Sequence, residues 1–98
     1  MNNKFYSMLG IGKKAGYIKA GETPCVDSIK KGKGYLLIIA EDASDNTKKK
    51  FTNLSDKNNL SYHIVGSKEL IGRSIGKELI STIVVCNKQF SSVLEDLL

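Results

Sequence analysis

The chain has 98 residues, 41% of them hydrophobic and 26% charged, a balance typical of one soluble globular domain over residues 1–98. This length excludes two modest domains, and no apolar run approaches the roughly 18–20 residues that a membrane-spanning helix needs. Fifteen basic residues against ten acidic ones give a net charge of +5, and the excess lies in residues 1–50. A basic surface on one side of a molecule attracts phosphate backbones and acidic membranes.

Two features favour a cytoplasmic protein. The N-terminal stretch, residues 1–6, carries one lysine and no apolar segment, unlike a secretory signal. Cys25 and Cys86 are isolated in the sequence and lack CxxC or metal-ligand spacing. We therefore predict two reduced core cysteines and no metal site.

A first helix is predicted over residues 3–14, because apolar residues recur there at near-helical spacing. Gly10 and Gly12 weaken this helix, and Gly16 is suited to end it. Residues 17–20 are typical of a short strand. The apolar side of the helix consists of Phe5, Met8, Leu9 and Ile11.

A second helix follows the Gly21–Pro24 turn. Thr23 is predicted as its N-cap and Pro24 as its first helical residue, where the missing N–H costs nothing. Gly32 or Gly34 is expected to end it. Its apolar side consists of Cys25, Val26 and Ile29.

The next strand is predicted over residues 35–40, a continuous apolar run that favours a central strand covered on both faces. Ser44 or Asp45 then caps a helix over residues 46–58, in which Phe51 and Leu54 point inward.

The last third of the chain continues the alternation. A strand over residues 62–65 precedes a helix capped by Ser67 and ended by Gly76, and a strand over 81–86 precedes a helix capped by Asn87. The buried side of the first helix is predicted to be Leu70, Ile71 and Ile75, and the last helix carries the apolar residues Phe90, Val93, Leu94 and Leu97.

This alternation predicts an α/β fold with a central sheet, parallel in part, and helices on both faces. In such sheets ligands gather at the carboxyl ends of strands, where loops lead into helix N-termini. Three loops qualify: Gly21–Pro24, Glu41–Asn46 and Gly66–Glu69.

Candidate catalytic groups have simpler structural explanations. Glu41 and Asp42 are adjacent carboxylates that could bind Mg²⁺, but capping of a local turn explains them better. His63 lacks a motif linking it to a nucleophile and is predicted to be a structural or surface residue. Gly10-Ile-Gly12 and Gly32-Lys-Gly34 fit neither a dinucleotide loop nor a phosphate loop.

Two groups of lysines remain as candidate anion-binding residues. Lys48, Lys49 and Lys50 lie on one predicted helix and point in different directions, as on a solvated face. Five other lysines flank the first two helices and would suit phosphate as a basic rim around a helix N-terminus. These are Lys13, Lys14, Lys30, Lys31 and Lys33.

Three segments in order, KAGYIKAG (14–21), LIIAEDAS (37–44) and VGSKELIGR (65–73), resemble those of the kink-turn RNA-binding ribosomal protein family, most closely its short bacterial YlxQ-type members. The resemblance covers roughly residues 3–88. It implies a three-layer α-β-α sandwich with a mixed four-stranded sheet. It also implies RNA binding without catalysis or a cofactor.

In this family the motif G-x-N-E-x-x-K, after the first strand, contacts sheared G·A pairs, and a second loop cups a flipped-out base. By this resemblance, the glycine of the motif corresponds to Gly21. The Asn, Glu and Lys positions of the motif are occupied by Thr23, Pro24 and Asp27. Thr23 offers one hydroxyl, Pro24 has no side-chain acceptor and no N–H, and Asp27 repels phosphate. The second loop corresponds to residues 65–68 and is intact. These departures predict altered specificity.

The sequence therefore predicts a non-catalytic RNA-binding protein that acts on structured RNA such as ribosomal RNA, with a translation-associated protein as candidate partner. One alternative is a protein-interaction module that kept the fold and lost the RNA. Another is the recognition domain of an RNA-modifying enzyme, which would need a partner subunit. The predicted RNA-binding residues are Gly21, Glu22, Thr23, Lys30, Lys31, Lys33, Ser44, Lys48, Gly66, Ser67 and Lys68.

Overall fold

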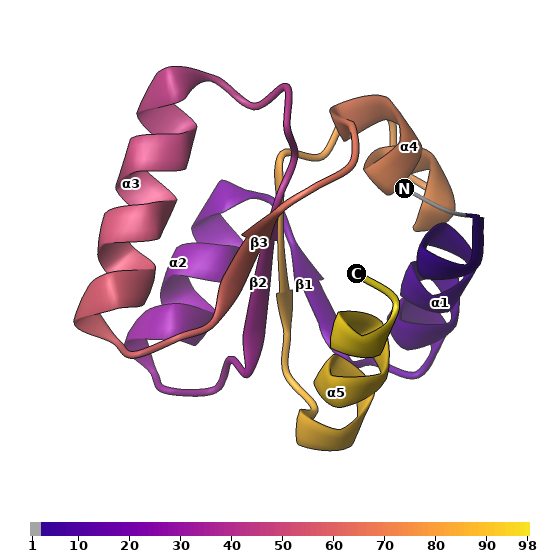
Figure 1. Cartoon of the computed structure of the whole chain (residues 1–98), viewed down its shortest axis with the longest axis horizontal. Coiled ribbons are helices and arrows are strands. Elements are labelled where there is room, and N and C mark those ends of the chain that lie inside the picture. Colours follow the sequence, from indigo (N-terminus) through magenta and orange to yellow (C-terminus); the bar gives the residue numbers. More distant parts are fainter. Residues whose placement is uncertain (1–2) are drawn as a thin grey trace.

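Helices and strands alternate along the chain, as the sequence pattern predicts (Figure 1). The structure is a computed structural model that describes residues 3–98; Met1 and Asn2, part of the stretch predicted not to be a signal, lie outside it. The elements are α1 (Asn3–Lys14), β1 (Ile18–Ala20), α2 (Glu22–Lys30), β2 (Leu36–Ile39), α3 (Asp45–Lys57), β3 (Tyr62–Ile64), α4 (Lys68–Ser74), β4 (Thr82–Val85) and α5 (Lys88–Asp96).

The four strands form one mixed sheet in the order β1-β4-β2-β3. β2 and β3 pair in parallel, while β4 pairs antiparallel with both β1 and β2. Helices α2 and α3 cover one face and α1, α4 and α5 the other (Figure 1). The predicted three-layer α-β-α sandwich is thus confirmed. Within residues 3–98, no helix has the length and apolar character needed to cross a membrane.

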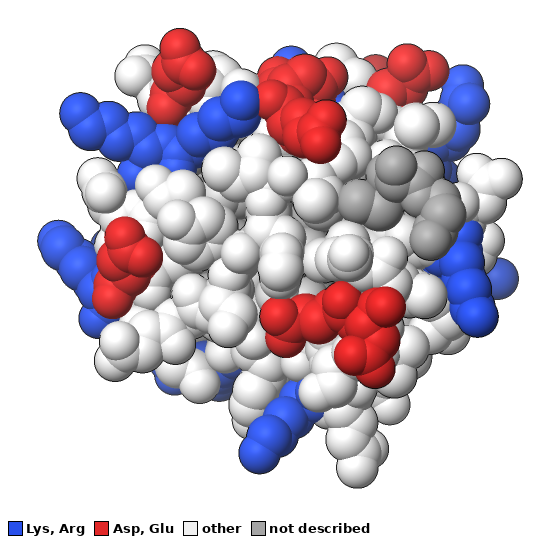
Figure 2. All heavy atoms as spheres, viewed as in Figure 1, with Lys and Arg blue, Asp and Glu red and all other residues white. Residues whose placement is uncertain are grey.

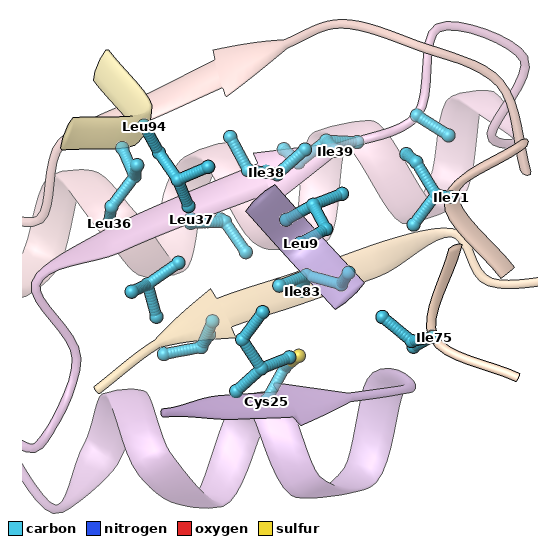
Figure 3. Packing of buried hydrophobic residues seen from close by; sticks show 14 of the residues in the cluster. Leu9, Cys25, Leu36, Leu37, Ile38, Ile39, Ile71, Ile75, Ile83 and Leu94 are labelled. Atoms are coloured by element: carbon cyan, nitrogen blue, oxygen red, sulfur yellow. The ribbon is translucent and has the colours of Figure 1, made fainter. Parts of the chain in front are cut away.

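The two central strands form the middle of the core. Every residue of β2 and β4 is buried, and Leu37 lies opposite Val84 in the antiparallel register. Residues from both helical layers pack onto these strands, including Leu9 from α1 and Cys25 from α2 (Figure 3). Because helices cover both faces, β2 is apolar at each position instead of alternating, as predicted.

Three of the predicted helix caps are confirmed. The Ser44 hydroxyl accepts a hydrogen bond from the Thr47 N–H at 3.1 Å and so begins α3. The Ser67 and Asn87 side chains accept bonds from Leu70 N and Phe90 N, at 3.1 and 2.8 Å. Each cap satisfies an N–H group that has no partner within its own helix.

The start of α2 differs from the prediction. Its N-cap is Gly21, not Thr23, and Pro24 occupies the third helical position instead of the first. The Cys25 N–H donates to Gly21 O at 3.1 Å, so Pro24 still removes no intrahelical bond. Gly21 has φ 96° and ψ 160°, a backbone conformation that is essentially restricted to glycine.

Three apolar residues that the sequence pattern singled out on the helices, one of them predicted to be buried, are exposed. Ile11 of α1 is 54% exposed, Leu70 of α4 is 43% exposed and Val93 of α5 is 45% exposed. Each lies next to a buried neighbour on the same helix, so the buried stripe is narrower than the apolar pattern indicates.

The glycines of α1 allow close helix packing, a role that the sequence did not indicate. A methyl group on Gly10 would lie 2.8 Å from the backbone oxygen of Ser74 in α4. One on Gly12 would lie 2.5 Å from Cε2 of Phe90 in α5. The propensity cost of two helical glycines is therefore offset by the approach of α1 to two neighbours.

We expect Gly12→Ala to destabilise the protein by about 1–3 kcal/mol, because the added methyl must displace the Phe90 ring. The direction of the change in unfolding free energy tests the packing, because replacing glycine with alanine in an unobstructed helix stabilises a protein by roughly 0.5–1 kcal/mol. Urea unfolding measures the difference. Ser7→Ala, on the exposed side of the same helix, is the matched control. A more stable Gly12→Ala protein would contradict the packing described here.

Cys25 is fully buried, as predicted, whereas Cys86 is only partly buried. Burial disfavours the thiolate and raises the pKa of Cys25 from 9.0 to about 11. The folded state therefore favours the neutral thiol. This preference stabilises the fold below pH 9 and is lost as the pH rises through about 11.

Replacing Cys25 with alanine should reduce the loss of stability between pH 8 and pH 11 by about 2 kcal/mol. The substitution also removes packing, but that loss is the same at both pH values and cancels in the comparison. Urea unfolding of both proteins at both pH values gives the difference. Equal losses in the two proteins would show that Cys25 does not resist ionisation.

Candidate nucleic-acid interface

Three loops meet at one edge of the sheet. Because β4 is antiparallel to both β1 and β2, and β3 is parallel to β2, strands β1, β2 and β3 all run in the same direction. Their carboxyl ends therefore lie together, at the upper edge in Figure 1. We call residues 21–24, 41–48 and 66–69 the loop edge. The three loops that the sequence singled out are thus brought together.

Two hydrogen bonds join the loops that follow β2 and β3. The Glu41 N–H donates to Gly66 O at 2.8 Å, and the Lys68 N–H donates to Asp42 Oδ1 at 2.9 Å. Asp42 thereby caps α4, which begins at Lys68. The sequence predicts that this carboxylate pair caps a local turn, whereas Asp42 caps a helix 26 residues further along the chain. Within residues 3–98, no group of His, Cys, Asp and Glu side chains is arranged to hold a metal ion.

Glu22 connects the loop after β1 to α3. Its Oε2 accepts a hydrogen bond from Thr47 Oγ1 at 3.3 Å, and its Oε1 lies 3.6 Å from Lys50 Nζ. The Thr47 hydroxyl also accepts a bond from the Ser44 hydroxyl at 2.9 Å. The sequence did not indicate that Thr47 and Lys50 contact Glu22, because these partners are more than twenty residues apart and share no motif.

The start of α2 offers few polar groups. The first N–H groups of a helix have no intrahelical acceptor and lie at the positive end of the helix dipole. Pro24 has no N–H, so Glu22 and Thr23 supply the donors within the helix at this end. The exposed Thr23 adds one hydroxyl. Asp27, one turn further on, forms an ion pair with Lys31 at 3.1 Å, and this pair offsets its negative charge.

The loop after β3 has a fixed shape. Gly66 has φ 76°, and a methyl group there would lie 2.8 Å from the Tyr6 hydroxyl. Beside it is a hollow of about 340 Å³. The hollow is lined by Tyr6, Glu41, Asp42, Gly66, Ser67 and Leu70. An aromatic ring, an aliphatic side chain and carboxylate acceptors together suit the face and amino edge of an unstacked base.

Lys48 and Lys68 are the predicted lysines that lie at the loop edge, in the first turns of α3 and α4. Both side chains are partly buried. The hydroxyls of Ser44 and Ser67 lie at the same edge, but both already serve as helix caps. These two hydroxyls therefore hold the loops in place, in addition to lying at the surface of the loop edge.

The other predicted lysines lie elsewhere, so the expected basic rim around a helix N-terminus is wrong. Lys30 ends α2, and Lys31 and Lys33 follow it, roughly 12 Å along the helix axis from Glu22. Lys13 and Lys14 end α1. Figure 2 shows basic atoms around the margin of the face seen in Figure 1, acidic atoms along its upper edge and a further acidic cluster just below its middle. Counting the residues of α2 would have revealed this separation from sequence.

His63 is part of a surface ion pair. Its Nε2 lies 3.1 Å from Glu95 Oε2, which links β3 to α5. The side chains of His63 and Glu95 are 38% and 40% exposed. The prediction of a structural or surface histidine is confirmed.

Comparison with known proteins gives consistent matches over nearly the whole chain. Residues 3–95 match the model of the ribosomal protein L7Ae/L30e/S12e/Gadd45 family. The RNA-binding protein YlxQ of Bacillus subtilis is 33% identical over 95 residues, which cover 97% of this chain and 95% of YlxQ.

Solved structures share the fold. A Bacillus halodurans protein described as having unknown function superimposes with a TM-score of 0.93 at 31% identity, covering 98% of this chain and 97% of its own. The 15.5 kD RNA-binding protein of Giardia lamblia has a TM-score of 0.79 at 20% identity, covering 99% and 87%. The latter likeness concerns the fold alone. The chain belongs to the ribosomal protein L7Ae/L30e/S12e/Gadd45 family.

Proposed function

We propose that this protein binds structured RNA through the loop edge and does so without catalysis. The observation that carries the proposal is the hydrogen-bonded joining of the loops, which holds the start of α2, Lys48 and Lys68 at one side of the molecule. Membership of the family and the similarity to an RNA-binding protein of Bacillus subtilis support it. The proposed setting is cytoplasmic, on ribosomal or other folded RNA, with a translation-associated protein as candidate partner.

Each part of the loop edge has a different task in this proposal. Lys48 and Lys68 contact phosphates and supply affinity that depends strongly on salt. Gly21, which has no side chain, lets RNA approach the N–H groups at the start of α2. The hollow beside Gly66 and Ser67 accepts an unstacked base. Folded RNA is thus selected by its shape and by one exposed base.

Altered specificity follows from the start of α2. Kink-turn binders of this family place amide, carboxylate and ammonium groups where this chain has Thr23, Pro24 and Asp27. One hydroxyl replaces several donors and acceptors, so contacts to sheared G·A pairs are reduced. The ion pair between Asp27 and Lys31 reduces repulsion of phosphate but supplies no positive charge. We therefore propose that RNA shape outweighs the G·A pairs in recognition.

A filter-binding panel tests this function. The panel contains a standard kink-turn RNA, the same RNA with its G·A pairs replaced, and an unrelated hairpin of equal length, each measured over a salt series. We expect the two kink-turn sequences to bind within about threefold of each other and both to exceed the hairpin. If replacing the G·A pairs lowers the affinity tenfold or more, the protein has the kink-turn specificity of its family, and the proposal of altered specificity is wrong. Absence of binding to all three RNAs at low salt would favour the protein-interaction alternative.

Charge reversal at the loop edge should weaken RNA binding more than the same change elsewhere. We expect Lys48→Glu combined with Lys68→Glu to lower affinity at least tenfold and to reduce the salt slope by roughly 1.4, about 0.7 for each lost phosphate contact. Lys13→Glu combined with Lys88→Glu is the control, because Lys13 near the end of α1 and Lys88 at the start of α5 lie at the opposite edge of the sheet. Equal losses in the two variants would mean that the loop edge is not the interface.

A further inference from the structure

A groove separates the two helices that cover one face of the sheet. It lies between α2 and α3 and has a volume of about 290 Å³. Its lining consists of Val26, Lys30, Lys50, Asn53, Leu54 and Lys57. Neither the loop edge nor the hollow beside Gly66 includes this groove.

Helical spacing explains why these residues face each other. Val26 and Lys30 are four residues apart on α2 and so share one side of it. On α3, Lys50, Asn53 and Lys57 recur at intervals of three and four and likewise share a side. The two sides meet across the groove, with the aliphatic Val26 and Leu54 partly buried against the core.

The groove holds more positive than negative charge. Three of its lining residues are lysines, and none is acidic. Lys50 has a carboxylate partner, Glu22, at 3.6 Å. Among the ion pairs of residues 3–98, none involves Lys30 or Lys57. Like charges gathered in one concavity repel one another and attract an anion, with the field strengthened by the concave walls.

The groove begins just beyond the loop edge, because its first lining residue on α3, Lys50, follows Lys48 by two positions. Glu22 is the first residue of α2 and pairs with Lys50 at the near end. Lys57, at the far end, is roughly 10 Å further along the axis of α3. A strand that leaves the loop edge therefore reaches the groove directly.

We propose that the groove between α2 and α3 binds the phosphates of an RNA strand that extends beyond the loop edge. Lys30, Lys50 and Lys57 contact phosphates, Asn53 donates to a phosphate or base oxygen, and the aliphatic floor packs against sugars. An acidic polypeptide would satisfy the lysines, but it lacks the continuity with a strand already held at the loop edge. The inference rests on the proposed RNA-binding function and adds a second contact area to it.

The test compares one RNA hairpin with and without a ten-nucleotide single-stranded extension, placed at the 5′ end in one RNA and at the 3′ end in another. For the natural protein, one of the extensions should tighten binding about three- to tenfold. Lys30→Gln combined with Lys57→Gln should abolish this gain and reduce the salt slope for the extended RNA by roughly 1.4, while leaving the bare hairpin unchanged. Lys77→Gln combined with Lys88→Gln, on the other side of the sheet, should keep the gain.

Several outcomes would overturn the proposal. If the gain persists in the Lys30 and Lys57 variant, or disappears equally in the control, the groove is not the contact. Polyglutamate that binds the natural protein as tightly as the extension would indicate an acidic protein instead. Failure of every RNA to bind would reject the proposed function itself, whereas normal binding of the bare hairpin keeps that function intact.

A second measurement is independent of the variants. The extension alone, as a ten-nucleotide RNA, is added to protein with ¹³C-labelled methyl groups. We expect shifts in the methyl signals of Val26 and Leu54, which line the groove, and unchanged signals for Val93 on α5. Shifts confined to Val93 or to Ile11 of α1 would place the extension elsewhere and contradict the proposal.

Discussion

Hydrogen bonds between the loops after β2 and β3 determine the geometry on which the proposed interface depends. The parallel pairing of the two strands continues beyond their ends, because Val65 N donates to Ile39 O at 2.9 Å and Glu41 N then donates to Gly66 O at 2.8 Å. The bond from Lys68 N to Asp42 Oδ1 extends the series by one more step. Two loops are thereby held as an extension of the sheet, so the surface proposed to bind RNA is already formed in the free protein.

In the proposed function, affinity and selectivity for RNA come from different features of the loop edge and the groove. Lysine contacts to phosphates supply binding that is independent of sequence and sensitive to salt. Selection depends on a fixed shape, provided here by Gly21, by the hollow beside Gly66 and by the caps that begin α3 and α4. A chain whose polar groups at the start of α2 are few can retain affinity through lysines while changing the RNA that it selects.

Local signals were enough to predict most of the fold. The apolar run of β2 and the caps Ser44, Ser67 and Asn87 each depend on residues close in sequence, and each was predicted correctly. Interactions between distant segments were not predictable in this way. Nothing in the sequence pairs Asp42 with Lys68, or Glu22 with Thr47 and Lys50.

The central claim is that one edge of the sheet forms the RNA interface. The most direct measurement is an NMR titration of ¹⁵N-labelled protein with the tightest-binding RNA, following every backbone amide. The account predicts the largest shifts at residues 21–23, 44–48 and 66–68, with smaller ones along the facing sides of α2 and α3. Shifts centred on α5 or on the end of α1, with the three loops unchanged, would contradict it.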